Sequence, residues 1–239
     1  MDAILHKANT RGHAAHGWLE SWHSFSFGRY HDPTRMHFGA LRVLNDDTVA
    51  PDAGFGQHGH DNMEIISIPL HGDLEHQDSM GNRQVIKQGD VQVMSAGTGI
   101  THSEKNANSD AFVKFLQIWV IPNQQNVSPR YAQQIFPEEQ RHNKLLTIIS
   151  PMGHAEGVNI YQNAWFSLSK LDRGNTVQYN LHDKNNGTYT FVLEGDVTVN
   201  EFALNRRDGL GLLAANSLLI TADTDAEILI MEVPLLGED

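Results

Sequence analysis

The chain has 239 residues, of which 40% are hydrophobic and 19% charged, as expected for a globular protein with one large domain or two smaller ones. Its formal net charge of −12 argues against direct nucleic-acid binding, which needs clustered Lys and Arg. The absence of cysteine excludes disulfides, thiolate nucleophiles and Cys-ligated metal sites.

Nothing in the sequence resembles a membrane or export segment. The apolar runs, such as residues 227–236, are far too short to cross a bilayer. The N-terminal segment 1–17 lacks the apolar core of a signal peptide. We therefore expect a cytoplasmic protein that does not bind membranes.

Short runs rich in Val, Ile, Leu, Phe and Thr, separated by turns with Gly, Asn or Asp, predict a mostly β protein. Many short strands at this spacing predict an antiparallel sandwich or barrel. Pro69 lies inside one expected strand and should sit at an edge or a bulge, because it cannot donate a ladder hydrogen bond. The expected strands of the first half are 38–44, 64–70, 72–76, 91–94 and 112–121.

The second half of the chain repeats this pattern weakly. Segment 189–199 resembles 65–75, since in both an apolar strand meets Gly-Asp and returns. A repeat of roughly 120 residues predicts two tandem barrels, and the polar segment 128–143 is the expected linker, with one helical turn. We place an N-terminal metal-binding domain at 1–135 and a C-terminal domain at 136–239.

The histidines are concentrated in the first domain, since eleven of the fourteen fall within residues 1–102. Aligning Gly72 with Gly195 places Leu181, Asp183 and Gly187 opposite the residues that we assign to chemistry below. The second domain is therefore expected to be a degenerate copy without a metal.

Two pairs of potential metal ligands follow glycine-rich turns: His58 and His60, then His102 and Glu104. In a β-strand, residues two apart point to the same side. Two neighbouring strands that face one interior would therefore place three imidazoles and a carboxylate around one point. Imidazole and carboxylate are ligands of divalent transition metals. The pattern predicts a three-His, one-carboxylate metal site.

A second carboxylate, Glu64, shares one parity with His58 and His60 on the strand expected after the Gly54–Gly56 turn. A His-x-His motif alone is short and common, and it also fits a loop that binds nothing. The second pair and the in-phase Glu64 together favour a metal. The carboxylate that acts as ligand or as proton acceptor in catalysis is either Glu104 or Glu64.

Other residues have more ordinary interpretations. His23, Phe25 and Phe27 alternate in phase, which is typical of core packing in an N-terminal strand. Trp119 is expected in the core rather than as a stacking platform. Three residues are expected at the rim of a pocket or in solvent: Glu75, His76 and Asp78. No role is assigned to the histidines without a spacing partner, which are His13, His16, His31 and His37.

The two ligand pairs resemble the two cupin motifs. The order His-x-His-x3-Glu of the first motif fits the first pair followed by Glu64, although the flanking glycines are shifted. The second motif fits Gly99, His102 and Asn106, with Ser95 in place of Pro.

More specifically, the chain resembles the pirin family of bicupins. The likeness runs strongly through residues 1–135 and loosely through the second half. It is closest to bacterial pirin-like proteins with quercetin dioxygenase activity. The blocks that carry it are 22–27, 30–33, 41–47, 76–82, 95–104 and 129–131.

This resemblance implies an all-β fold of two tandem cupin barrels (double-stranded β-helices, or jelly rolls) with a few short helices. It implies that His58, His60, His102 and Glu104 bind one divalent metal ion, usually Fe²⁺, although such a site also accepts Ni, Cu, Mn or Zn. Glu64 stands in the usual cupin carboxylate position and is the alternative ligand.

The implied activity is a metal-dependent dioxygenase that cleaves a flavonol-like aromatic compound such as quercetin with O₂ and releases carbon monoxide. Two alternatives stay open, because a fold does not determine a function. One is a pirin-type regulatory module that binds a metal and a protein partner without turnover. The other is a different cupin enzyme, such as an isomerase.

Overall fold

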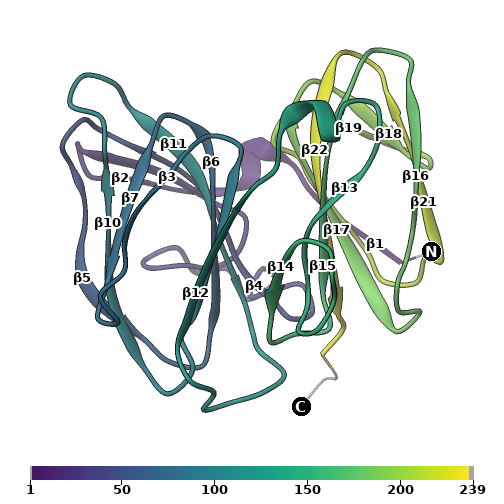
Figure 1. Ribbon diagram of the computed structural model, residues 1–239. Coiled ribbons are helices and arrows are strands. Elements are labelled where there is room, and N and C mark those ends of the chain that lie inside the picture. Colours follow the sequence, from purple (N-terminus) through teal and green to yellow (C-terminus); the bar gives the residue numbers. More distant parts are fainter. Residues whose placement is uncertain (1, 237–239) are drawn as a thin grey trace.

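The computed structural model describes residues 2–236 and contains two β-barrels that lie side by side (Figure 1). Each barrel combines a seven-stranded sheet with a four-stranded sheet. Within residues 2–236, no helix is long and apolar enough to cross a membrane. The two short helices are single 3₁₀ turns, η1 (Ala8–Thr10) and η2 (Glu138–Gln140).

The first barrel contains the histidine-rich part of the chain. Its seven-stranded sheet has the order β12 (Arg130–Ile135), β9 (Asp90–Ser95), β6 (Glu64–His71), β11 (Val113–Val120), β4 (Leu41–Val49), β3 (Leu19–His23) and β2 (Gly12–Ala15). Its four-stranded sheet has the order β5 (Gly54–His60), β10 (Ile100–Asn106), β7 (Leu74–Asp78) and β8 (Arg83–Ile86).

The second barrel has the same arrangement. Its seven-stranded sheet has the order β1 (Ala3–His6), β20 (Gly209–Leu212), β17 (Asn186–Glu194), β22 (Ala226–Pro234), β15 (Trp165–Leu171), β13 (Leu146–Pro151) and β14 (Val158–Ile160). Its four-stranded sheet has the order β16 (Thr176–Asn180), β21 (Ser217–Ala222), β18 (Val197–Val199) and β19 (Phe202–Leu204).

The structure confirms the internal repeat. The order β9–β6–β11–β4 in one sheet corresponds to β20–β17–β22–β15 in the other. The two Gly-Asp turns match as well, because Gly72 and Gly195 both have positive φ angles, +74° and +76°. At one edge of each large sheet, the strand order does not follow the order of the chain. Strand β1 pairs with β20 as β12 pairs with β9, so the N-terminal strand lies in the sheet of the second barrel.

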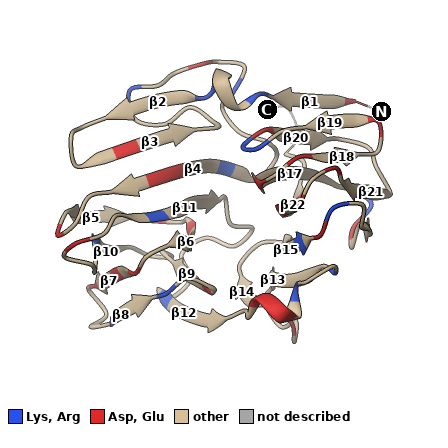
Figure 2. Cartoon of the chain, turned by 90° about the horizontal axis from the view of Figure 1, so that it is seen from above, with Lys and Arg blue, Asp and Glu red and all other residues tan. Residues whose placement is uncertain are grey.

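The strands follow the expected positions, with one informative difference. The strand expected over 38–44 is β4, which runs from Leu41 to Val49 and so includes the polar segment Asn45-Asp46-Asp47. Asp46 pairs with Arg11 and Arg207, whereas Asp47 is buried and lines a cavity inside the first barrel. Figure 2 shows this acidic part of β4 between β3 and β11.

Two smaller expectations concern Pro69 and the linker. Pro69 lies on β6 beyond its pairing with β9, beside a register irregularity in β11, as expected for a residue without an N–H donor. The linker contains the expected helical turn, η2, but its first part forms β12, which pairs with β9 of the first barrel.

The largest hydrophobic cluster lies where the two seven-stranded sheets face each other. Ile66 and Ile68 of β6 point into it, together with Phe166 of β15 and Met231 of β22. Since side chains alternate along a strand, Ser67 points to the opposite side, into the first barrel. This alternation leaves the interior of the first barrel available for polar side chains.

Gly39 lies where the two barrels approach each other closely, and its lack of a side chain allows this approach. Its φ angle is +51°, and a Cβ atom there would lie 2.2 Å from the backbone oxygen of Pro234. Gly81 also has a positive φ angle, +90°, but a Cβ atom on it would meet no atom of the described chain within 4 Å. Comparing substitutions at the two glycines therefore separates the free-energy cost of a positive φ angle from the cost of a steric clash with the neighbouring backbone.

We predict that Gly39→Ala lowers the free energy of unfolding by at least about 2 kcal/mol more than Gly81→Ala, because both variants strain the backbone but only the first forces the barrels apart. Urea denaturation of both variants measures the difference. Equal losses of stability would contradict the close approach at Gly39.

Candidate metal centre

Strands β5 and β10 bring the three predicted imidazoles together. The strands are antiparallel neighbours, and His58 lies directly opposite His102. His60 follows two residues later on the same face. The ring centroid of His102 lies 4.4 Å from that of His58 and 5.0 Å from that of His60. One nitrogen of each ring lies within 4.8 Å of the others, as a shared metal ion requires.

Glu104 lies beside His102 in the interior of the barrel. The chain shifts register relative to β5 between these two residues, and the Glu104 carboxylate is buried. Ser67 Oγ donates a hydrogen bond to its Oε1 at 2.8 Å, and Gln117 Nε2 donates to its Oε2 at 2.7 Å. These two donors, on β6 and β11, fix the orientation of the carboxylate.

Two of the imidazoles, those of His102 and His60, are in the neutral state that a metal requires. Both ring nitrogens of His102 are buried, and neither has a hydrogen-bond partner among the described residues. Burial and the neighbouring His58 and His60 rings lower the pKa of His102 to about 2, and burial lowers the pKa of His60 to about 4. Neutral imidazole is the form that binds a metal.

His58 is already oriented. Its Nδ1 is hydrogen-bonded to the backbone oxygen of Gly56 at 2.8 Å, so Nε2 is the free nitrogen. The three imidazoles are therefore a donor set that fits a divalent transition metal. The Glu104 ligand atoms lie within 4.8 Å of those of His102 and His76, in a group that does not include His58 or His60.

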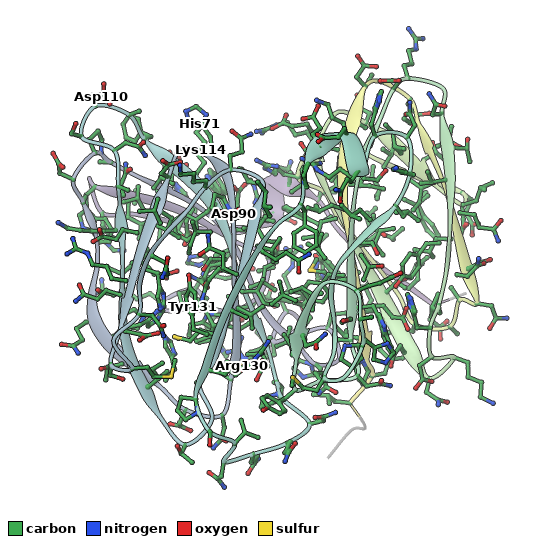
Figure 3. All side chains as sticks on the ribbon, viewed as in Figure 1. His71, Asp90, Asp110, Lys114, Arg130 and Tyr131 are labelled. Atoms are coloured by element: carbon green, nitrogen blue, oxygen red, sulfur yellow. The ribbon has the colours of Figure 1, made fainter. Side chains whose placement is uncertain are left out.

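A fourth imidazole, His76, lies on the other side of Glu104. It was expected at a pocket rim or in solvent, but it is fully buried, and its Nε2 lies 3.2 Å from Asp78 Oδ2. His76 is the strand partner of Glu104, and its ring lies 4.9 Å from that of Tyr131, which is labelled in Figure 3. The residues His76, His102 and Glu104 form a second group with ligand atoms within 4.8 Å of one another. Along β7, His76 lies on the buried side together with Leu74 and Asp78.

The structure does not bring Glu64 to the imidazoles. Strand β5 ends at His60, and Glu64 begins β6 in the other sheet, so the expected shared parity is wrong. The Glu64 carboxylate accepts a hydrogen bond from Ser95 Oγ at 2.8 Å and another from the backbone of Tyr161. A catalytic role for Glu64 stays a prediction.

A cavity of about 760 Å³ opens beside the imidazoles, within the size range of small-molecule sites. Trp119, expected in the core, lines this cavity, and its ring makes an edge contact with that of His60 at 4.9 Å. Phe25 packs in the core as expected. Several residues of the N-terminal strands and the following loop, to which no site role was assigned, also line the cavity: His13, His16, His23, Phe27 and Tyr30.

Known proteins share this fold and much of the sequence. A family model described as Pirin matches residues 5–120, and one described as quercetinase C-terminal cupin domain matches residues 147–233. A quercetin 2,3-dioxygenase from Escherichia coli is 40% identical over 230 residues, which are 96% of this chain and 98% of that protein. A pirin-like protein from Caulobacter vibrioides is 40% identical over 222 residues, 92% of this chain and 95% of that one.

Among solved structures, a bacterial pirin from Escherichia coli in complex with nickel(II) superposes with a TM-score of 0.92 at 38% identity, covering 98% of this chain and all of that one. The predicted fold of two tandem cupin barrels is confirmed by this likeness and by the matched models. The comparisons also support a divalent metal, without identifying it for this chain.

We predict that His60→Ala lowers the metal content of the purified protein at least about tenfold, because one of three imidazole ligands is lost. His76→Ala is the matched control and should keep its metal, since three imidazoles and Glu104 remain. Elemental analysis measures both. Loss of the metal in His76→Ala but not in His60→Ala would assign the ion to the second group.

Glu64→Gln should keep the metal content of the parent and change the pH dependence of stability. Burial raises the pKa of Glu64 from 4.5 to about 7, although the hydrogen bond from Ser95 opposes this shift. Between these pH values the folded state holds a proton that the unfolded state has lost. The stability of the parent therefore falls as pH rises from 4.5 to 7.

Because glutamine does not ionise, the Glu64→Gln variant should lack this part of the fall and gain stability relative to the parent across that pH window. Urea denaturation at several pH values, with metal analysis of the same samples, tests both expectations. Loss of metal from the variant would instead make Glu64 a ligand.

Proposed function

The chain belongs to the pirin family, and from that premise we propose that it is a metal-dependent dioxygenase acting on a flavonol-like substrate. One observation carries this proposal: the cluster of His58, His60 and His102 lines a cavity large enough for an aromatic ring system. The name of the Escherichia coli relative, a quercetin 2,3-dioxygenase, supports O₂ and quercetin as the reactants to test.

We propose Fe²⁺ as the native metal, bound by the three imidazoles and Glu104. When bound, the ion would act as a Lewis acid and make a coordinated substrate hydroxyl more acidic. Nickel, copper, manganese and zinc suit the same ligands, and the Escherichia coli structure with nickel(II) shows that a related pirin takes up another metal.

The residues of the chain orient the substrate and receive its proton. Trp119 and Phe27, whose rings meet edge to face at 5.4 Å, form an aromatic wall beside His60. Ile65 and Phe55 add apolar surface that excludes water. Glu104 is the proton acceptor in this proposal, because its carboxylate lines the cavity and is held in place by two hydrogen bonds.

The proposal is tested by oxygen consumption. Metal-loaded protein mixed with quercetin should consume O₂ and release carbon monoxide with a ring-opened product, and the same mixture without O₂ should leave quercetin intact. Metal binding without O₂ uptake would instead favour a regulatory module, and a rearranged product without O₂ uptake would favour an isomerase.

Glu104→Gln should keep part of the metal but lower the rate of O₂ uptake by about 100-fold or more, because the amide cannot accept the substrate proton. An oxygen electrode and metal analysis of the same sample separate the two effects. An unchanged rate, or a larger loss in Glu64→Gln, would show that Glu104 is not the proton acceptor.

A further inference from the structure

A second polar cluster lines the same cavity on strands β3 and β4. Ser21 lies opposite Asp47, and His23 lies opposite Asn45, in the antiparallel pairing of these strands. All four side chains are buried and line the cavity. Four polar groups on one inward face are costly to bury unless they bind each other or a ligand.

The hydrogen bonds within this cluster determine the tautomer of His23 when Asp47 is ionised. Burial raises the pKa of Asp47 to about 7, so above that pH the carboxylate is ionised and Ser21 Oγ donates its only proton to Asp47 Oδ1. Ser21 Oγ then accepts the hydrogen bond from His23 Nε2 at 2.8 Å. Burial lowers the pKa of His23 to about 4, which keeps the ring neutral. A neutral ring with its proton on Nε2 has a free lone pair on Nδ1, and this atom has no hydrogen-bond partner within residues 2–236.

Two more free acceptors continue from His23 along the same row of the sheet. Asn45 lies opposite His23 on one side and Gln117 on the other. The Nε2 of Gln117 donates to Glu104, which leaves its Oε1 as an acceptor. Neither Asn45 Oδ1 nor Gln117 Oε1 has a partner in the described part of the chain, and both atoms are buried.

We propose that this row of acceptors, His23 Nδ1, Asn45 Oδ1 and Gln117 Oε1, binds hydroxyl groups of the substrate away from the metal. Hydroxyl groups donate hydrogen bonds, whereas methoxy, keto and carboxylate groups only accept them. The site therefore selects a polyhydroxylated aromatic ring and rejects analogues whose hydroxyls are absent or methylated. This inference rests on the proposed function and adds the specificity of the same cavity.

In this arrangement, His23 and Asn45 determine specificity, and Ser21 and Asp47 are positioning residues that hold the His23 ring in its acceptor form. A buried acceptor without a donor costs free energy. A ligand that lacks the hydroxyl therefore binds more weakly for two reasons: one hydrogen bond is missing, and a buried acceptor has no partner in the complex.

The test compares two probes, quercetin and 3-hydroxyflavone, which share the 3-hydroxy-4-keto pair but differ in their remaining hydroxyls. Binding to anaerobic, metal-loaded protein is followed by quenching of tryptophan fluorescence. The parent protein should bind quercetin at least about tenfold more tightly. His23→Phe and Asn45→Leu should each lower this preference by about tenfold and weaken 3-hydroxyflavone binding little.

Gln92→Leu is the matched control. Gln92 is a buried amide of the same barrel, and both of its polar side-chain atoms lack partners within the described residues, but it does not line the cavity. This variant should keep the full preference for quercetin, which separates hydroxyl recognition from a general effect of removing a buried polar group.

Equal binding of the two probes by the parent protein would overturn the inference, even if the variants failed to fold. If the preference fell equally in Gln92→Leu and His23→Phe, the inference would also be overturned. In both cases O₂ uptake with either flavonol would leave the proposed function standing. Metal-loaded protein that neither binds nor oxidises either compound would overturn both.

Discussion

The antiparallel pairing of β5 with β10 is the constraint on which the metal centre depends. It places His58 directly opposite His102, and the period of two along each strand adds His60 and Glu104 to the same side. A slip of one residue would turn one pair of side chains out of the barrel and leave the other without partners. Ser67 and Gln117, which belong to the seven-stranded sheet, then orient the Glu104 carboxylate through two hydrogen bonds.

The second barrel has the same strand arrangement but different side chains in its interior. The strands that correspond to β5 and β10 are β16 and β21, and their inward residues Val177, Tyr179, Leu218 and Ile220 fill the interior with a hydrophobic cluster. A buried carboxylate occurs there too, but Glu232 accepts hydrogen bonds from several donors of its own barrel. The packed barrel instead supports the first one through the shared apolar layer between the large sheets.

Local rules explain why the imidazoles could be predicted from the sequence. The spacing of His58 and His60 and of His102 and Glu104 reflects strand periodicity, which needs no knowledge of distant contacts. The same rule failed for Glu64, because the chain leaves one sheet after His60 and enters another at Glu64. Strand parity applies only within one continuous strand.

The row of acceptors formed by His23, Asn45 and Gln117 could not be predicted for a related reason. From the sequence, the strand before Asn45 is expected to end at Leu44, and His23 is expected to pack in the core. Here His23 and Asn45 face an internal cavity that is lined by several strands far apart in the sequence. Burial of His76 and the exchange of β1 into the second barrel likewise depend on contacts between distant segments.

The most direct test of the metal centre is anomalous X-ray diffraction from crystals of the metal-loaded protein, recorded at the absorption edge of the bound metal. The account predicts one peak within about 2.2 Å of a nitrogen of each of His58, His60 and His102; Glu104 is the proposed fourth ligand. A peak bound by His76 and Glu104, with His58 and His60 free, would contradict the account.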